Sequence, residues 1–184
     1  MDAPFVASDE PAGLRSVTAA NAVRLGWPVA ATLLIAAYAI IVSLLVMPGN
    51  VDVSWLLTIG ERVLDGERLS VDIIEVNPAF SAWLYLPFVL LERLTGLSAE
   101  FWVSIGVTAL AITSVWFSAR IAARADETLK RHLWMAPAAV FFVLFLFPID
   151  FGQREQIAVI VLLPWLALFS ARDRTVDFKA GSVA

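Results

Sequence analysis

Long apolar runs without charged residues alternate with polar segments along this chain. The run 27–47 contains no charge and is about as long as a helix that crosses a bilayer. Runs of the same character occupy 101–117 and 133–147, and a shorter run at 157–169 carries Pro164. We therefore predict an all-α polytopic membrane protein with about four transmembrane helices. The expected spans are residues 27–47, 100–119, 133–148 and 156–170.

The segment 48–99 lies between the first two predicted spans and begins with an amphipathic pattern. Across 53–65 apolar residues share one helical face and polar residues occupy the other, and Gly66 follows. The apolar positions are Val53, Leu56, Leu57, Gly60, Val63 and Leu64. We expect a helix that lies on the membrane surface and stops at Gly66. Residues 67–78 are expected to be extended or irregular before a turn at Pro78.

The run 79–91 is ambiguous because it is apolar for only about 13 residues. It contains Pro87 and is followed by Glu92 and Arg93. Runs of this length are more often re-entrant or interfacial than spanning. Whether this run crosses the membrane decides the side on which every later segment lies.

The distribution of cations favours an interfacial position for this run. Positively charged segments stay on the cytoplasmic side of a membrane, and the loop 118–132 is the most basic in the chain. If 79–91 does not span, that loop, the tail 1–26 and the tail 171–184 are all cytoplasmic. We therefore expect a multi-pass protein of the bacterial cytoplasmic (inner) membrane with both termini cytoplasmic. The outer loops 48–99 and 148–156 then lie on one side and can form one site.

The composition supports the membrane class and excludes several others. Hydrophobic residues make up 60% of the chain and charged residues 16%, and the mean hydropathy is +0.80. The chain has no basic tract that would neutralise a nucleic-acid backbone, so we predict no nucleic-acid partner. With no cysteine and one histidine, His132, we predict neither a metal site nor a cofactor. The polar residues before the first span indicate an uncleaved signal-anchor.

Asp52 stands where the predicted surface helix begins, in the outer loop that also holds most of the acidic residues outside the tails. A carboxylate at a partly dry interface can gain basicity and take a proton from a hydroxyl group, which makes Asp52 a candidate catalytic base. The alternative is a helix N-cap, in which an aspartate oxygen accepts from free backbone N–H groups. The pattern leaves both roles open, and they are compatible.

Two further groups of polar residues are candidates for substrate binding. Asp72, Glu75 and Asn77 precede an apolar run and can form a wall of a substrate site, or else belong to a solvated loop. The second group fills a very short loop between two apolar spans and consists of Asp150, Gln153, Arg154 and Glu155. Arg154 can bind a phosphate through its planar fork, or the group can be an internally paired ion cluster.

Several of these residues together carry a family resemblance. Asp52, Trp55, Leu64, Asp65 and Gly66 are followed by the run VDIIEVNP at 71–78. This order resembles the first outer loop of bacterial membrane glycosyltransferases of the dolichyl-phosphate-mannose protein mannosyltransferase type (glycosyltransferase family 39). These enzymes have the GT-C fold and include the lipid A aminoarabinose transferases. The run DFGQRE at 150–155 resembles a second outer loop in such proteins, and the resemblance covers about residues 27–170.

The resemblance implies a specific activity. In that family the first outer loop carries the catalytic aspartate, which matches Asp52, and two juxtamembrane helices, which match 53–65 and 79–94. The donor is a polyprenyl-phosphate sugar, and the lipid or glycan acceptor lies on the outer face. The expected function is therefore sugar transfer, with Arg154 neutralising the leaving phosphate and Glu75, Asn77 and Asp150 positioning sugar or acceptor.

The chain also departs from the family pattern. Val53 replaces the second acid of the family's acidic pair, and Asn77 replaces the lysine that commonly precedes the proline. Family members run on through many more spans, so we expect this chain to be the N-terminal part of a GT-C-like enzyme or a truncated member. The alternative is a non-catalytic membrane scaffold or inactive fragment in polysaccharide or envelope assembly, with a membrane-protein partner.

Overall fold

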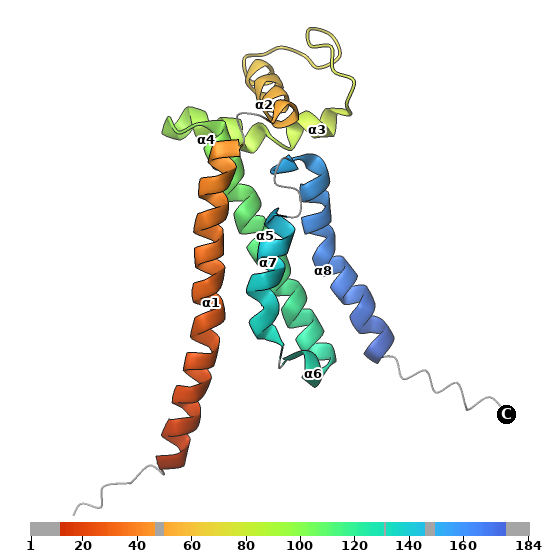
Figure 1. The fold of residues 1–184 in the computed structure, drawn as a ribbon. Coiled ribbons are helices and arrows are strands. Elements are labelled where there is room, and N and C mark those ends of the chain that lie inside the picture. Colours follow the sequence, from red (N-terminus) through yellow and green to blue (C-terminus); the bar gives the residue numbers. More distant parts are fainter. Residues whose placement is uncertain (1–11, 47–49, 131, 146–149, 176–184) are drawn as a thin grey trace, which may run out of the picture.

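The computed structural model describes residues 12–46, 50–130, 132–145 and 150–175, and every regular element within them is a helix (Figure 1). The predicted all-α class is thus confirmed. The helices are α1 (Ala12–Val46), α2 (Val51–Leu64), α3 (Ala79–Trp83), α4 (Leu86–Thr95), α5 (Ala99–Ala125), α6 (Glu127–Lys130), the 3-10 helix η2 (Leu133–Met135), α7 (Ala136–Phe145) and α8 (Arg154–Thr175).

Within the described ranges, three helices are long and apolar enough to cross a membrane. They are Gly26–Leu45 of α1, Ala99–Ala125 of α5 and Arg154–Arg172 of α8. The prediction of a membrane protein is therefore supported by three of the expected spans. The fourth expected span, 133–148, corresponds to the shorter apolar helical stretch Leu133–Phe145, and residues 146–148 lie outside the described part of the chain.

Four apolar helices run alongside one another, with α5 at their centre (Figure 1). Helix α5 packs against α1, α7 and α8, and α1 also packs against α7. The buried residues Val103, Val107 and Ala111 form part of the core on α5. Helices α2, α3 and α4 gather at the end where α1 stops and α5 starts, and α6 lies at the opposite end. We call these the α2 end and the α6 end of the bundle.

The run 79–91 lies across the α2 end of the bundle and not alongside the long helices (Figure 1). It forms the two short helices α3 and α4 in place of the single predicted helix 79–94. The break falls at Leu84 and Tyr85, because Pro87 fits only the first turn of the second helix, where its missing N–H costs nothing. Trp83, Leu90 and Leu94 are exposed, as expected for side chains at a lipid interface.

Helix α1 begins at Ala12, within the predicted tail 1–26, and its candidate membrane span begins at Gly26. The segment from Ala12 to the span is rich in alanine, leucine and arginine, which have high helix propensity. The span therefore continues a helix that starts well before it.

Helix α2 exists as predicted, but its apolar face packs on protein. Val53, Leu56, Leu57, Ile59 and Gly60 are buried, and the helix packs against α3 and α4. Helices α3 and α4 therefore cover the apolar face of α2, and the position of α2 at the membrane surface stays a prediction. A Cβ atom on Gly60 would stand 3.1 Å from Val89 Cγ2 of α4, so an alanine here would require Val89 to shift by a few tenths of an ångström.

Candidate functional site

The two polar outer loops of the predicted topology are in direct contact. Asn50 Nδ2 donates to the Phe151 carbonyl oxygen over 3.2 Å, and Tyr85 Oη donates to the Gly152 carbonyl oxygen over 2.7 Å. Arg154 Nη1 donates to Ser81 Oγ over 3.1 Å. The start of α2, the α3–α4 corner and the start of α8 therefore meet at the α2 end of the bundle. We call the place where these three segments meet the contact region.

Asn50, and not Asp52, caps α2. The helix begins at Val51, and Asn50 Oδ1 accepts a hydrogen bond from the Val53 N–H over 3.3 Å. The N-cap interpretation of Asp52 is therefore wrong. Asp52 lies in the first helical turn with an exposed side chain, where the helix dipole favours a negative charge.

Tyr85 is fully buried at the α3–α4 corner. Burial raises the pKa of its phenol far above the ordinary value. The positive charge of Arg154 acts in the opposite direction, while the negative charges of Glu155 and Asp52 raise the pKa further. Tyr85 is thus a neutral hydrogen-bond donor, and these three charged side chains are close enough to act on it.

Arg154 is the cation of this contact region. The Arg154 side chain is 27% exposed. It forms an ion pair with Glu155, in which Arg154 Nη2 lies 3.7 Å from Glu155 Oε1. The other terminal nitrogen, Nη1, donates a hydrogen bond to the neutral hydroxyl group of Ser81, which is buried. A guanidinium with one long ion pair and one neutral partner keeps part of its fork available to an anion.

Gln153 and Asp150 complete the described part of the α7–α8 loop. Gln153 Nε2 lies 3.4 Å from Asn50 Oδ1, and its backbone N–H donates to the Asp150 carbonyl oxygen over 3.0 Å. Gln156, one turn into α8, accepts from the Gly152 N–H over 2.7 Å. Its Nε2 donates to the carbonyl oxygens of Val143 and Leu144, at the end of α7.

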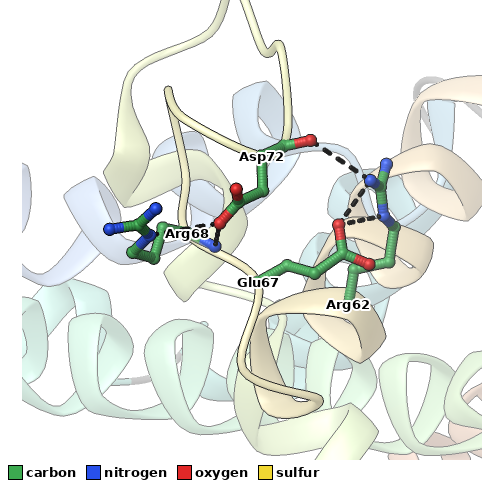
Figure 2. Close-up of polar contacts among 4 residues, drawn as sticks. All are labelled: Arg62, Glu67, Arg68 and Asp72. Atoms are coloured by element: carbon green, nitrogen blue, oxygen red, sulfur yellow. Dashed lines mark hydrogen bonds and ion pairs between the residues drawn. The ribbon is translucent and has the colours of Figure 1, made fainter.

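Asp72, Glu75 and Asn77 lie apart from this contact region, in the α2–α3 segment. Asp72 Oδ2 accepts from the Arg68 backbone N–H over 2.9 Å and from its Nε over 3.2 Å, as Figure 2 shows. These bonds hold the pKa of Asp72 below its usual range, the backbone bond most strongly. Arg62 in turn donates to Glu67 and to the Asp72 carbonyl oxygen. Asp72 thus organises its own loop.

Glu75 is held in a similar way. Its Oε1 accepts from the backbone and side-chain nitrogens of Asn77 over 2.8 and 2.7 Å, and its Oε2 accepts from Trp55 Nε1 over 2.5 Å. The Asn77 backbone bond is the main reason that the pKa of Glu75 is lowered. In the described chain, the side-chain hydrogen bonds of Asp72, Glu75 and Asn77 stay within the α2–α3 region and do not reach Arg154.

A cavity of about 830 Å³ lies between α5, α7 and α8. Its walls are mainly apolar, with Val115, Ala139 and Leu163 among the lining residues. At the α2 end it is bordered by four polar residues, Asp150, Gln153, Glu155 and Gln156. At the α6 end it is bordered by Leu129 and His132. The cavity therefore runs along the apolar bundle and ends beside the contact region.

Four residues of the contact region were missed in the sequence: Asn50, Ser81, Tyr85 and Gln156. Asn50 had a usable signal, since asparagine is favoured directly before a helix. Ser81 and Tyr85 are polar groups within an otherwise apolar run, but the pattern does not reveal their distant partners. No three acidic or histidine side chains converge as metal ligands among the described residues.

Comparison of the chain with protein-family models, with curated proteins and with solved structures gave no match. The resemblance to GT-C glycosyltransferases therefore stays a prediction.

Proposed function

We propose that the protein transfers a sugar from a polyprenyl-phosphate donor to a hydroxyl-bearing acceptor at the outer face of the membrane. One observation carries this proposal: an apolar cavity along the bundle ends at the polar loop that leads into Arg154. An isoprenoid chain fits apolar walls, and a phosphate fits a partly free guanidinium.

The polar residues have distinct roles in this proposal. The Asp52 carboxylate takes the proton of the acceptor hydroxyl as its oxygen attacks the anomeric carbon. The bond from that carbon to the phosphate oxygen breaks, and the polyprenyl phosphate leaves with the electron pair. Arg154 neutralises the charge that develops on this leaving group. Inversion at the anomeric carbon follows from a single displacement.

The remaining candidates bind substrate. Asp150, Gln153 and Glu155 stand where the cavity meets the contact region and bind the sugar hydroxyl groups. Asp72, Glu75 and Asn77 organise the α2–α3 segment, which forms a wall on the acceptor side. Asp52 is exposed, so an acceptor reaches it from the outer solution.

A transfer assay on the wild-type chain in lipid nanodiscs tests this function. Polyprenyl-phosphate sugars are supplied as a panel, and released polyprenyl phosphate is measured. Asp52→Asn should lower the rate at least ~100-fold because it removes the base. Asp65→Asn, a change of the same kind at the C-cap of α2, is the control and should keep the wild-type rate. Transfer that survives Asp52→Asn, or no consumption of any donor, would contradict the proposal.

The proposed role of Arg154 in binding the donor phosphate can be tested separately from the role of Asp52. Arg154→Gln should weaken donor binding and lower turnover, because the phosphate loses its positive partner in a region of reduced dielectric. Arg120→Gln, near the other end of α5, removes an equal charge far from the contact region and should have no effect. Equal behaviour of the two variants would rule out Arg154 as the phosphate-binding residue.

One observation favours the second candidate function, a non-catalytic membrane scaffold. Ile74 and Val76 of the α2–α3 segment are 91% and 95% exposed. Exposed apolar side chains that lie together in one patch mark surfaces that contact another protein, and these two are close in sequence. A scaffold would retain a stoichiometric membrane-protein partner in detergent, lose it on Ile74→Asp, and keep it on Asp52→Asn.

A further inference from the structure

Three buried polar side chains hold two consecutive residues of the α7–α8 loop. Asn50 donates to the Phe151 carbonyl oxygen, Tyr85 donates to the Gly152 carbonyl oxygen, and Gln156 accepts from the Gly152 N–H. Asn50 is 4% exposed, Tyr85 0% and Gln156 6%. Buried polar groups are costly unless they are hydrogen-bonded, so this arrangement fixes the loop backbone tightly. We call Asn50, Tyr85 and Gln156 the loop clamp.

Gly152 is the residue that the clamp requires. Its φ is +80°, in the left-handed region that residues with a Cβ adopt only with strain. This conformation lets its N–H point to Gln156 while its carbonyl oxygen meets Tyr85. The loop therefore has one well-defined path where it enters α8.

Asn50 also joins the clamp to α2. The oxygen that caps the helix at Val53 lies 3.4 Å from Gln153 Nε2, and the nitrogen of the same amide reaches the Phe151 carbonyl oxygen. The starts of α2 and α8 are thus held by one side chain. Asp52 stands two positions after Asn50, and Arg154 stands two positions after Gly152.

We propose that Asn50 and Tyr85 are positioning residues that set the separation between Asp52 and Arg154. The inference rests on the proposed function, in which these two charged groups are the base and the phosphate-binding residue. Asn50 and Tyr85 do not line the cavity that would hold the donor, and they take no part in the reaction. The clamp acts by fixing the two helix starts, and a misplacement of about 1 Å can cost ~100-fold in rate.

Two substitutions remove the clamp contacts with little other change. Tyr85→Phe deletes one hydroxyl and keeps the buried ring. Asn50→Ser keeps an oxygen that can cap α2, but the shorter side chain does not reach the Phe151 carbonyl oxygen. Each should lower kcat about 10- to 100-fold while KM for the polyprenyl-phosphate donor stays within about twofold.

Two controls separate positioning from a general loss of stability. Tyr38→Phe removes the other tyrosine hydroxyl of the chain, on α1. Ser98→Ala removes the N-cap of α5, where Ser98 Oγ accepts from the Phe101 N–H over 3.3 Å. Ser98→Ala should lower the melting temperature through the lost cap without changing kcat.

A distance measurement tests the clamp without any activity. The chain contains no cysteine, so Thr58→Cys on α2 and Val161→Cys on α8 allow one pair of spin labels. The distribution of distances between the labels, measured in nanodiscs, should be narrow in this background. It should broaden or shift when Tyr85→Phe or Asn50→Ser is added, and should not change with Tyr38→Phe.

The outcomes distinguish the clamp from the function on which it rests. An unchanged distance distribution in both clamp variants would overturn the clamp. A changed distribution with unchanged kcat would overturn its role in positioning. A wild-type chain that transfers no sugar would contradict the proposed function and this catalytic role together, and the distances would still decide whether the clamp joins α2 to α8.

Discussion

The hydroxyl group of Tyr85 donates a 2.7 Å hydrogen bond to the backbone carbonyl oxygen of Gly152, 67 residues further along the chain. The α2–α5 connection and the α7–α8 loop both contribute to this one contact, and the phenol is fully buried. Because water does not replace a lost partner in such a place, the contact should be visible in the stability of the whole bundle.

Tyr85→Phe should lower the free energy of unfolding by about 1–3 kcal/mol. The substitution leaves the Gly152 carbonyl oxygen without this partner, while the ring keeps its packing. Thermal unfolding in detergent, followed by circular dichroism, measures the effect. Tyr38→Phe is the matched control, because the Tyr38 side chain is exposed on α1. Equal melting temperatures for the two variants would contradict the prediction.

The same burial predicts an unusual titration. In a Tyr38→Phe background Tyr85 is the only tyrosine, so the pH-dependent change in absorbance near 295 nm, above the constant contribution of the tryptophans, reports on it. Burial raises the pKa of Tyr85, so we expect no tyrosinate at about pH 11 while the protein stays folded, where an ordinary phenol is largely ionised. The pKa of Tyr85 is higher in the folded state than in the unfolded state. The free energy of unfolding therefore keeps its full value below about pH 10 and decreases as the pH rises further. Tyrosinate near pH 10 would show that the phenol is exposed.

The helical class and three long apolar helices could be predicted from the sequence because hydrophobic periodicity is a local property. The distribution of charge further predicted that the two polar loops lie on one side and can form one site. It did not predict the clamp. Tyr85 and Ser81 read as parts of an apolar run, since their partners Gly152 and Arg154 lie far away in the chain. Periodicity carries no information about such pairs.

Two features of α2 could not be read from the pattern alone. Asp52 was considered as a possible N-cap, but Asn50, two residues earlier, caps the helix that begins at Val51. The amphipathic pattern predicted that one face of α2 is covered, but such a pattern does not show what covers it. Here α3 and α4 cover it.

The α2–α3 segment should loosen when Glu75 loses its charge. The carboxylate accepts from Trp55 and from two nitrogens of Asn77, and these bonds lower its pKa. A lowered folded-state pKa gives stability that is present above the ordinary value near about 4.3 and is lost as the pH falls through the lowered value. The Trp55 indole N–H signal in NMR spectra should therefore change in acid.

Glu75→Gln reproduces this loss of charge at neutral pH. Trypsin should then cut faster after Arg68, which lies in the segment shown in Figure 2. Glu92→Gln, on α4, is the control. Identical cleavage rates at Arg68 in wild type and Glu75→Gln would mean that the segment does not depend on the carboxylate.

The packing of α4 on α5 depends on Gly106. A Cβ atom at this position would lie 2.5 Å from Phe88 Cε1, so Gly106→Ala must displace the ring. We expect a loss of about 1–3 kcal/mol from overpacking, opposed by a gain of up to about 1 kcal/mol in helix propensity. Thermal unfolding measures the balance, which should be a net loss.

A double variant identifies the cause. The double variant Gly106→Ala/Phe88→Leu should be at least as stable as Phe88→Leu alone, because the smaller side chain at position 88 leaves room for the methyl group. Gly60→Ala is a milder comparison, since its nearest contact would be 3.1 Å from Val89 Cγ2. Additive losses in the double variant would show that ring and methyl group do not meet.

The sidedness of the bundle can be measured with single cysteines, because the chain contains none. Asn77 and Ser98 belong to the α2 end of the bundle, and Glu127 belongs to α6 at the opposite end (Figure 1). Positive charge near α6 predicts that this end is cytoplasmic. In intact cells a membrane-impermeant maleimide should therefore label Asn77→Cys and Ser98→Cys, and should label Glu127→Cys only after the membrane is permeabilised. Labelling of Glu127→Cys from outside would invert the arrangement and place Asp52 and Arg154 in the cytoplasm. An acceptor on the outer face would then be out of reach, so this single result would also remove the proposed transfer reaction.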